Sequence, residues 1–211
     1  GGDEGETLGD VSVSVTDSNI DVLYGGANEA NITGNVDVDI DNSNIVKTFG
    51  GNNLSGVISG NVTLDITDLN KTYLGVSDTY VYGGGNMADI DGSVTLTFES
   101  GVVTELYGGA NEADIASDVN LNISGGNITT VYGGNNASGD ISGSINLTVD
   151  GGTIDNVNEW GLRDLAYEIN KEKKGYYVVI EASVSSSSVV DEFARRAKFN
   201  ANVLRHLVIA K

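Results

Sequence analysis

Short runs of alternating apolar and polar residues recur along the first 150 residues of the chain. Two examples are Val36-Asp37-Val38-Asp39-Ile40 and Val119-Asn120-Leu121-Asn122-Ile123. A period of two places successive side chains on opposite faces of a strand. Each run therefore predicts a β-strand with one apolar and one polar face. A turn containing Gly or Asn follows each run and leads to a second apolar stretch.

The same pattern repeats at a fixed distance. An aromatic residue followed by Gly-Gly recurs with spacings of 25, 33, 25 and 25 residues, at Tyr24, Phe49, Tyr82, Tyr107 and Tyr132. An asparagine stands four residues after each aromatic, at Asn28, Asn53, Asn86, Asn111 and Asn136. An isoleucine follows, at Ile32, Ile58, Ile90, Ile115 and Ile141. The longer spacing predicts eight inserted residues within Asp68 to Thr79.

A 25-residue unit with such short strands has to bury its apolar face against neighbouring units. Stacking the units about 4.8 Å apart gives every strand a partner above and below. We therefore predict a mainly β fold for this part, a right-handed parallel β-helix, or β-solenoid, of about five to six coils. The early run Val11 to Val15, with Ile20, predicts a first, partial coil.

Two polar features of the repeat have a structural explanation. The Gly-Gly pairs suit corners that need a positive φ or a close approach of two backbones. The five asparagines predict a ladder, in which side-chain amides in register hydrogen-bond along the stack. Asn28, Asn53, Asn86, Asn111 and Asn136 are therefore candidate structural residues.

Charge divides the chain in two. Residues 1–151 contain 22 acidic residues against Lys47 and Lys71, whereas residues 152–211 contain eight acidic and nine basic residues. The strongly acidic part disfavours nucleic acid and anionic lipid as partners. No apolar run approaches the length of about 18 residues that spans a bilayer, so no membrane partner is expected.

The residue types argue against an enzyme. Cysteine is absent from the chain, and His206 is its only histidine, so neither a Ser-His-Asp triad nor a thiolate metal site can be assembled in the repeats. Paired carboxylates, such as Asp37 with Asp39, leave a glycan hydrolase open as an alternative, which two converging carboxylates in a cleft would distinguish. The corresponding positions in other coils carry Thr or Asn, which favours a solvated polar face. We expect no cofactor.

Calcium binding is a second alternative. The pattern Gly-Gly-x-Asn-x-x-Asp-Ile at residues 83–90 and 108–115 is similar to Gly- and Asp-rich solenoids that bind calcium. The Asp position, however, is occupied by Asn31 in an earlier coil and by Val57 in the next. We therefore expect an acidic corner and no metal site.

The repeat ends near residue 150, which predicts domains at 1–150 and 151–211. Ile154 and Val157 still hold repeat positions, but Asn158 replaces the aromatic residue. Beyond this point the pattern predicts a hairpin over 157–183, a helix over 188–198 and a last strand over 203–209.

Two family resemblances follow from these motifs. Residues 11–157 resemble bacterial surface β-solenoid proteins with repeats of the form Tyr-Gly-Gly-Gly/Ala-Asn. Residues 151–211 resemble the C-terminal part of bacterial ribosomal small-subunit protein S6. The matching motifs are Glu-Trp-Gly-x-Arg at 159–163, Leu-Ala-Tyr-x-Ile at 165–169, Gly-Tyr-Tyr at 175–177 and Asn-x-Val-Leu-Arg-His-Leu at 202–207.

The second resemblance implies a partial ferredoxin-like ββαβ segment, from a family that binds rRNA and a small partner protein. It places Arg163 at a possible RNA contact. The family's first strand and helix are missing here. Residues 151–157 read Gly-Gly-x-Ile-x-x-Val, which fits both the repeat and the ribosomal pattern. A recombination between two genes, or an error that joined two genes during sequence assembly, would produce such a shared motif at the junction.

The leading hypothesis is a non-catalytic, adhesin-like module of an exported bacterial surface protein, fused naturally or artefactually to the ribosomal-like segment. Its expected partner is a neutral glycan or a host or cell-surface protein. A third hypothesis is rRNA binding through the C-terminal segment, with a cytoplasmic ribosomal location. The unpaired strand edges of that truncated segment also predict a homodimer formed through it.

Overall fold

The structure is a computed structural model that describes residues 2–70, 78–149, 152–184, 190, 193–194, 197–198 and 203–209. The chain divides into two compact units, Gly1–Val149 and Asp150–Lys211. The following paragraphs treat each unit by itself. Within the described residues, no helix is long and apolar enough to cross a membrane.

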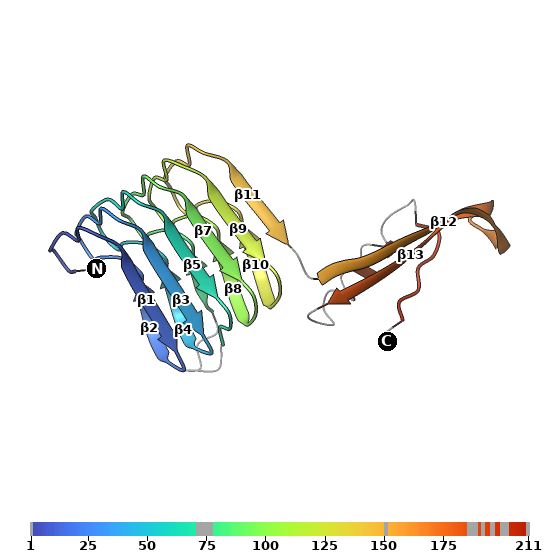
Figure 1. Ribbon diagram of the computed structural model, residues 1–211, viewed down its shortest axis with the longest axis horizontal. Coiled ribbons are helices and arrows are strands. Elements are labelled where there is room, and N and C mark those ends of the chain that lie inside the picture. Colours follow the sequence, from blue (N-terminus) through green and yellow to red (C-terminus); the bar gives the residue numbers. More distant parts are fainter. Residues whose placement is uncertain are drawn as a thin grey trace. The chain divides into compact units, whose positions relative to one another are not determined.

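The first unit is a parallel β-solenoid, as the repeat predicts (Figure 1). One side is a six-stranded sheet whose order along the stack follows the chain, β1-β3-β5-β7-β9-β11. Its strands are β1 Val11–Thr16, β3 Val36–Asp41, β5 Val62–Ile66, β7 Val94–Phe98, β9 Val119–Ile123 and β11 Ile145–Val149. All neighbouring pairs are parallel and keep equivalent repeat positions side by side.

A second side is a five-stranded parallel sheet with the order β2-β4-β6-β8-β10. Its strands are β2 Asn19–Tyr24, β4 Asn44–Phe49, β6 Tyr80–Tyr82, β8 Val102–Tyr107 and β10 Asn127–Tyr132. The third side has only isolated parallel bridges, which join the repeat isoleucines from Ile32 to Ile141 and begin at Thr7. Each of the first five coils thus has two strands and one bridge position, and the sixth has Ile141 and β11.

The core is a stack of aliphatic side chains that point into the coils. Strands β5, β7 and β9 alternate buried and half-buried residues, as the alternating sequence predicts. Ile32, Ile58, Ile90 and Ile115 are buried on the third side. Each fully buried Val, Leu or Ile contributes roughly 1.5–3 kcal/mol, and this burial depends on the neighbouring coils.

Close backbone approach explains the Gly-Gly corners. A methyl group on Gly50 would collide with the carbonyl oxygen of Gly83 in the next coil, and Gly83 meets Gly108 in the same way. Positive φ values occur elsewhere, at turn glycines such as Gly56 and Gly139. Of the two explanations expected from the sequence, close approach therefore applies.

The eight extra residues are divided between two places, which corrects the expected single insert. Ile32 pairs with Ile58, an offset of 26 residues, whereas the asparagines of the same two coils are 25 residues apart. One residue is thus added in the corner between Asn53 and Ile58. The remaining seven lie between Asn70 and Tyr80, where the offset to the preceding coil reaches 33.

The first coil is whole, which corrects the expected partial coil. Residues 2–24 occupy all three sides, because Thr7 bridges to Ile32 and β1 and β2 pair with β3 and β4. Asp3 also takes the ladder position of this coil and accepts a hydrogen bond from Asn28 Nδ2 at 2.8 Å.

The second unit contains a long hairpin, β12 Gly152–Ile169 and β13 Glu172–Val184, paired antiparallel with irregular register at several points. Of the expected helix over 188–198, the described residues Val190, Phe193, Ala194, Ala197 and Lys198 are helical. The expected last strand is wrong, because described residues 203–209 form no strand. An apolar run becomes a strand only when its backbone pairs with a neighbouring strand, and the described residues 203–209 pair with neither β12 nor β13.

Candidate functional site

The five predicted asparagines form one hydrogen-bonded column on a corner of the solenoid. Each Nδ2 donates to the Oδ1 of the preceding coil, at distances of 2.7–2.9 Å, through Asn53 to Asn28, Asn86 to Asn53, Asn111 to Asn86 and Asn136 to Asn111. The side chains are half-buried, except for the exposed Asn136. Each inner amide both donates and accepts, so the column satisfies polar groups that would otherwise compete for water.

Two further asparagines, which the sequence analysis did not single out, lie one residue earlier. Asn52 is fully buried, and its Oδ1 accepts from the Ala27 backbone N–H at 2.6 Å. Its Nδ2 donates to the carbonyl oxygen of Ala30 at 2.9 Å. Asn135 makes equivalent bonds to Ala110 and Ala113, at 2.8 and 3.0 Å.

A signal for these inner asparagines was present in the sequence. Both belong to coils with Gly-Gly-Asn-Asn, and in both coils the repeat isoleucine comes five residues after the ladder asparagine rather than four. The extra length holds Gly56 or Gly139 at positive φ, and the carbonyl oxygen of that glycine accepts from the same Nδ2. The doubled asparagine and the longer corner thus occur together, because the inner asparagine binds the carbonyl oxygen of the added turn.

The aromatic anchors form a second ladder on the five-stranded sheet. Successive rings of Tyr24, Phe49, Tyr82, Tyr107 and Tyr132 are stacked, with centroids 4.7–4.9 Å apart and interplanar angles of 5–9°. The three middle rings are buried by their neighbours. Because little of these ring faces is accessible, the ladder stabilises the stack rather than offering a platform for a planar ligand.

Two tyrosines of this ladder, Tyr82 and Tyr107, have a raised pKa. Burial raises the pKa of Tyr107, and the hydrogen bond that its hydroxyl donates to Glu105 Oε2 at 2.7 Å raises it further. Burial also raises the pKa of Tyr82, with a smaller contribution from the charge of Glu105. Lys47 lies over the ring of Tyr80 at 5.6 Å from its centroid.

The outward face of the six-stranded sheet carries two straight columns of polar side chains. Strand register places Ser12, Asp37, Thr63, Thr95, Asn120 and Asn146 in one column. It places Ser14, Asp39, Asp65, Thr97, Asn122 and Thr148 in the other. Carboxylates are confined to β3 and β5, whereas β7, β9 and β11 present only hydroxyls and amides in these columns.

The carboxylates considered for catalysis lie on this face. Asp37 has Ser12 and Thr63 beside it on the neighbouring strands, and Asp39 has Ser14 and Asp65. Asp39 and Asp65 are therefore neighbours in register on adjacent parallel strands.

The positions considered for calcium have another role. Val57, Asp114 and Asp140 each donate a backbone N–H to the side-chain oxygen of Asn31, Asp89 or Asp114, at 2.8–2.9 Å. These side chains join one coil to the next at the corner, and Asn replaces Asp there without loss of the acceptor. Among the described residues, no group of three or more His, Asp or Glu side chains could hold a metal ion.

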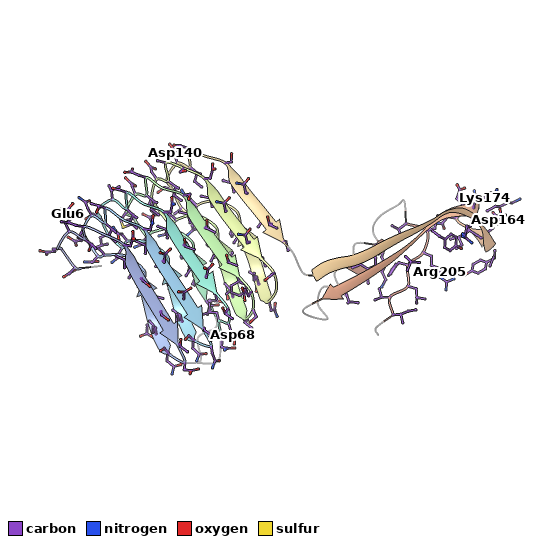
Figure 2. All side chains as sticks on the ribbon, in the orientation of Figure 1. Glu6, Asp68, Asp140, Asp164, Lys174 and Arg205 are labelled. Carbon is purple, nitrogen blue, oxygen red and sulfur yellow. The ribbon has the colours of Figure 1, made fainter. Side chains whose placement is uncertain are left out.

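Acidic side chains lie at both edges of the solenoid. Figure 2 shows Glu6 and Asp140 at the edge formed by the third side, and Asp68 at the opposite edge, where β5 turns toward β6. Both edges therefore repel polyanions.

In the second unit, Arg163 is exposed on β12, opposite Gly175 of β13. Lys174 and Asp164 form an exposed ion pair at 3.5 Å, near the tip of the hairpin (Figure 2). His206 packs edge-on against Phe193, with centroids 6.0 Å apart, and Arg205 donates to the Tyr167 hydroxyl at 2.8 Å. The ring contact gives His206 a packing role.

The fold defines residues 2–149 as a parallel β-solenoid, and comparison with known proteins identifies a segment that follows and partly overlaps it. Residues 144–210 match the family model of ribosomal protein S6. A relative is the small ribosomal subunit protein bS6 of Wolbachia sp. subsp. Brugia malayi (strain TRS), 52% identical over 50 residues, which are 24% of this chain and 19% of the relative.

These findings confirm the S6 resemblance and extend it toward the N-terminus, since the match begins within the last coil. The chain spans about a fifth of the length of this curated relative. No solved structure matches the chain significantly.

Proposed function

We propose that the solenoid is a non-catalytic, adhesin-like module of an exported bacterial surface protein, and that the outward face of its six-stranded sheet binds an uncharged glycan. The observation that carries this proposal is the neutral region over β7, β9 and β11. Thr95, Thr97, Asn120, Asn122, Asn146 and Thr148 stand there in two columns on a continuous parallel sheet.

The chemistry of this region fits a glycan. Hydroxyl and amide groups both donate and accept hydrogen bonds, which matches the donor and acceptor hydroxyls of a sugar. Neighbouring strands repeat the same groups about every 4.8 Å, so an extended chain meets equivalent partners along the stack. The carboxylates on β3 and β5 would repel anionic polymers, which favours an uncharged ligand over a polyanion.

The test is a glycan array probed with the full chain. We expect retention on one or more neutral glycans, and a loss of at least tenfold in affinity when Asn120→Asp and Asn122→Asp place carboxylates in the neutral region. The matched control, Ser12→Asp with Ser14→Asp at the acidic end, should bind as the unaltered chain does. Absence of binding to any neutral glycan, or equal effects of the two variants, would contradict the proposal.

The competing activity is glycan hydrolysis by Asp39 and Asp65. We expect incubation with the retained glycan to release no new reducing ends. Release that disappears in Asp39→Asn would establish a hydrolase and overturn the non-catalytic assignment.

A second candidate function rests on the ribosomal similarity of residues 144–210. Arg163 and the basic residues of this segment would contact RNA phosphates, and the protein would then be cytoplasmic. Filter binding with an rRNA fragment should show an affinity that falls with salt and is weakened by Arg163→Glu. RNA binding that is equal in unaltered and Arg163→Glu chains would count against this role for Arg163.

A further inference from the structure

Three adjacent rings of the aromatic ladder are phenols, which gives this part of the ladder a chemistry beyond packing. Tyr82, Tyr107 and Tyr132 stack with centroids 4.9 and 4.7 Å apart and interplanar angles of 5° and 9°. The π systems of rings stacked in this way overlap, so an electron can pass from one ring to the next. Phe49 lacks a hydroxyl, is harder to oxidise than a phenol, and separates this group from Tyr24. We call the three rings the tyrosine stack.

Tyr107, in the middle of the tyrosine stack, has a proton acceptor in place. Its hydroxyl donates a hydrogen bond to Glu105 Oε2 at 2.7 Å, a length typical of a hydroxyl bonded to an ionised carboxylate. Removal of one electron turns a phenol into a strong acid, so the proton leaves with the electron when a base lies within hydrogen-bond distance. The structure therefore provides at Tyr107 for the loss of both the electron and the proton.

Neighbouring charges favour electron loss at Tyr107 over Tyr80, which packs against the same aromatic cluster. Lys47 lies beside Tyr80 in register, and its Nζ is 5.6 Å from the centroid of the Tyr80 ring. A positive charge at this distance opposes removal of an electron from the ring. The negative charge of Glu105 at the Tyr107 hydroxyl has the opposite effect on Tyr107.

Burial determines what happens to an oxidised ring. Tyr82 and Tyr107 are only 5% and 4% exposed, because neighbouring rings cover their faces. Two phenoxyl radicals that meet in solution couple covalently, and rings buried in this way cannot meet a second chain. Tyr167 in the second unit, which is 61% exposed, has no such protection. A radical on the tyrosine stack is therefore longer-lived than one on an exposed tyrosine.

We propose that the tyrosine stack is a one-electron redox site, in which Tyr107 gives an electron to an oxidising radical, such as a peroxyl radical, and gives its proton to Glu105. The hydroxyl O–H bond of Tyr107 breaks and a new O–H bond forms at Glu105 Oε2, while the peroxyl radical takes up the electron and becomes a peroxide anion. The products in the protein are a neutral tyrosyl radical, shared along the stack, and a protonated Glu105.

This site is independent of the glycan-binding face proposed above, because the aromatic ladder belongs to the five-stranded sheet and the glycan face to the six-stranded sheet. Its consequence for the molecule is that the solenoid intercepts oxidising radicals and keeps the unpaired electron on buried rings. The property requires no other protein and no bound cofactor, so the full chain is sufficient to test it.

The first test measures how fast the tyrosyl radical forms. A light flash generates ruthenium(III) tris-bipyridine, a cationic one-electron oxidant that the acidic solenoid attracts, and transient absorption follows the radical. We expect Glu105→Gln to slow radical formation at least about tenfold, because a neutral amide is a poor proton acceptor. The matched control is Glu99→Gln, which removes one exposed carboxylate from the turn after β7 and should leave the rate unchanged.

The second test measures the yield of long-lived radical. Tyr107→Phe keeps a ring in the ladder, as Phe49 does, and removes the phenol. We expect it to lower the yield of long-lived radical at least tenfold, whereas Tyr167→Phe should leave that yield unchanged. The proposal is overturned if Glu105→Gln and Glu99→Gln chains form the radical at the same rate, or if Tyr107→Phe leaves the yield of long-lived radical as it is in the unaltered chain.

Discussion

Thr48 shows how a single hydroxyl interrupts the aliphatic core. Its side chain stands in the inward column of the five-stranded sheet, between Leu23 and Val81. It is fully buried, and its Oγ1 has no hydrogen-bond partner within the described structure. A buried hydroxyl without a partner costs roughly 1–3 kcal/mol, so this residue is a weak point of the core.

We expect Thr48→Val to raise the free energy of unfolding by about 1 kcal/mol, because valine has a similar shape and removes the unsatisfied hydroxyl. The matched control is Thr79→Val. Thr79 is also buried, but its Oγ1 accepts from the Thr104 N–H at 3.1 Å and donates to the Val102 carbonyl oxygen. That variant should lose about 1–2 kcal/mol. Denaturant titration measures both, and a loss in both would show that Thr48 has a partner after all.

The two faces of a strand should differ in the same assay. Ile115 is fully buried, and Ile115→Ala should cost about 2–5 kcal/mol, because it leaves a cavity in the middle of the stack. Asn120→Ala should change stability by about 0.5 kcal/mol at most, since its bond with Asn146 is exposed and is replaced by water. Equal losses would mean that the inward and outward faces are wrongly assigned.

At the scale of one corner, the two adjacent asparagines have different roles. Asn52→Ala should cost at least about 2 kcal/mol, because the buried backbone groups of Ala27 and Ala30 both lose their partner. Asn53→Ala removes half-buried ladder bonds and should cost about 1 kcal/mol.

Deleting Gly56 in the Asn52→Ala chain provides the control, because it restores the short corner found beside Ala27 and Ala110. We expect this deletion to recover part of the lost stability in thermal unfolding. If the deletion made the Asn52→Ala chain less stable, the longer corner would be independent of the inner asparagine.

The aromatic ladder predicts a dependence on alkaline pH. The folded chain holds the pKa of Tyr107 above its ordinary value of about 10, so the unfolded chain ionises first as the pH rises. This contribution to stability is complete below pH ~10 and is lost above it.

Tyr107→Phe should make that alkaline loss smaller, and phenylalanine fits because Phe49 already occupies the same column. Thermal unfolding as a function of pH measures the effect, and the ultraviolet absorbance of tyrosinate gives the titration itself. An identical alkaline loss in both chains would assign it to other groups.

At the scale of the whole molecule, the predicted homodimer depends on the apolar end of the ribosomal-like segment. Leu207 and Ile209 are 80% and 76% exposed and form no strand. Such side chains favour association with a second chain. We expect light scattering to show a dimer that Leu207→Asp with Ile209→Asp converts to a monomer. Leu8→Asp, at an equally exposed site of the solenoid, should leave the dimer intact, and a monomeric unaltered chain would refute the prediction.

The sequence by itself determined the parallel stack, the asparagine column positions and the S6-like segment. Each of these depends on residues that recur at a fixed spacing or match a motif. Residues at equivalent positions of the repeat are the ones that meet in the stack, so the sequence pattern alone identifies them. The repeat isoleucines Ile32, Ile58, Ile90 and Ile115 illustrate this. Each coil supplies one of them, and each lies beside the isoleucine of the neighbouring coil.

Only the tertiary structure decided how the corners are built and where strands end. The inner role of Asn52, the divided insert and the unpartnered Thr48 depend on which backbone groups of adjacent coils meet. The segment over 203–209 has the apolar residues of a strand but forms none, because a strand also needs a backbone partner, and these residues pair with neither β12 nor β13. The local sequence pattern determines which face of a strand is apolar. The hydrogen-bond partners of that strand are determined by the segment of chain that packs beside it.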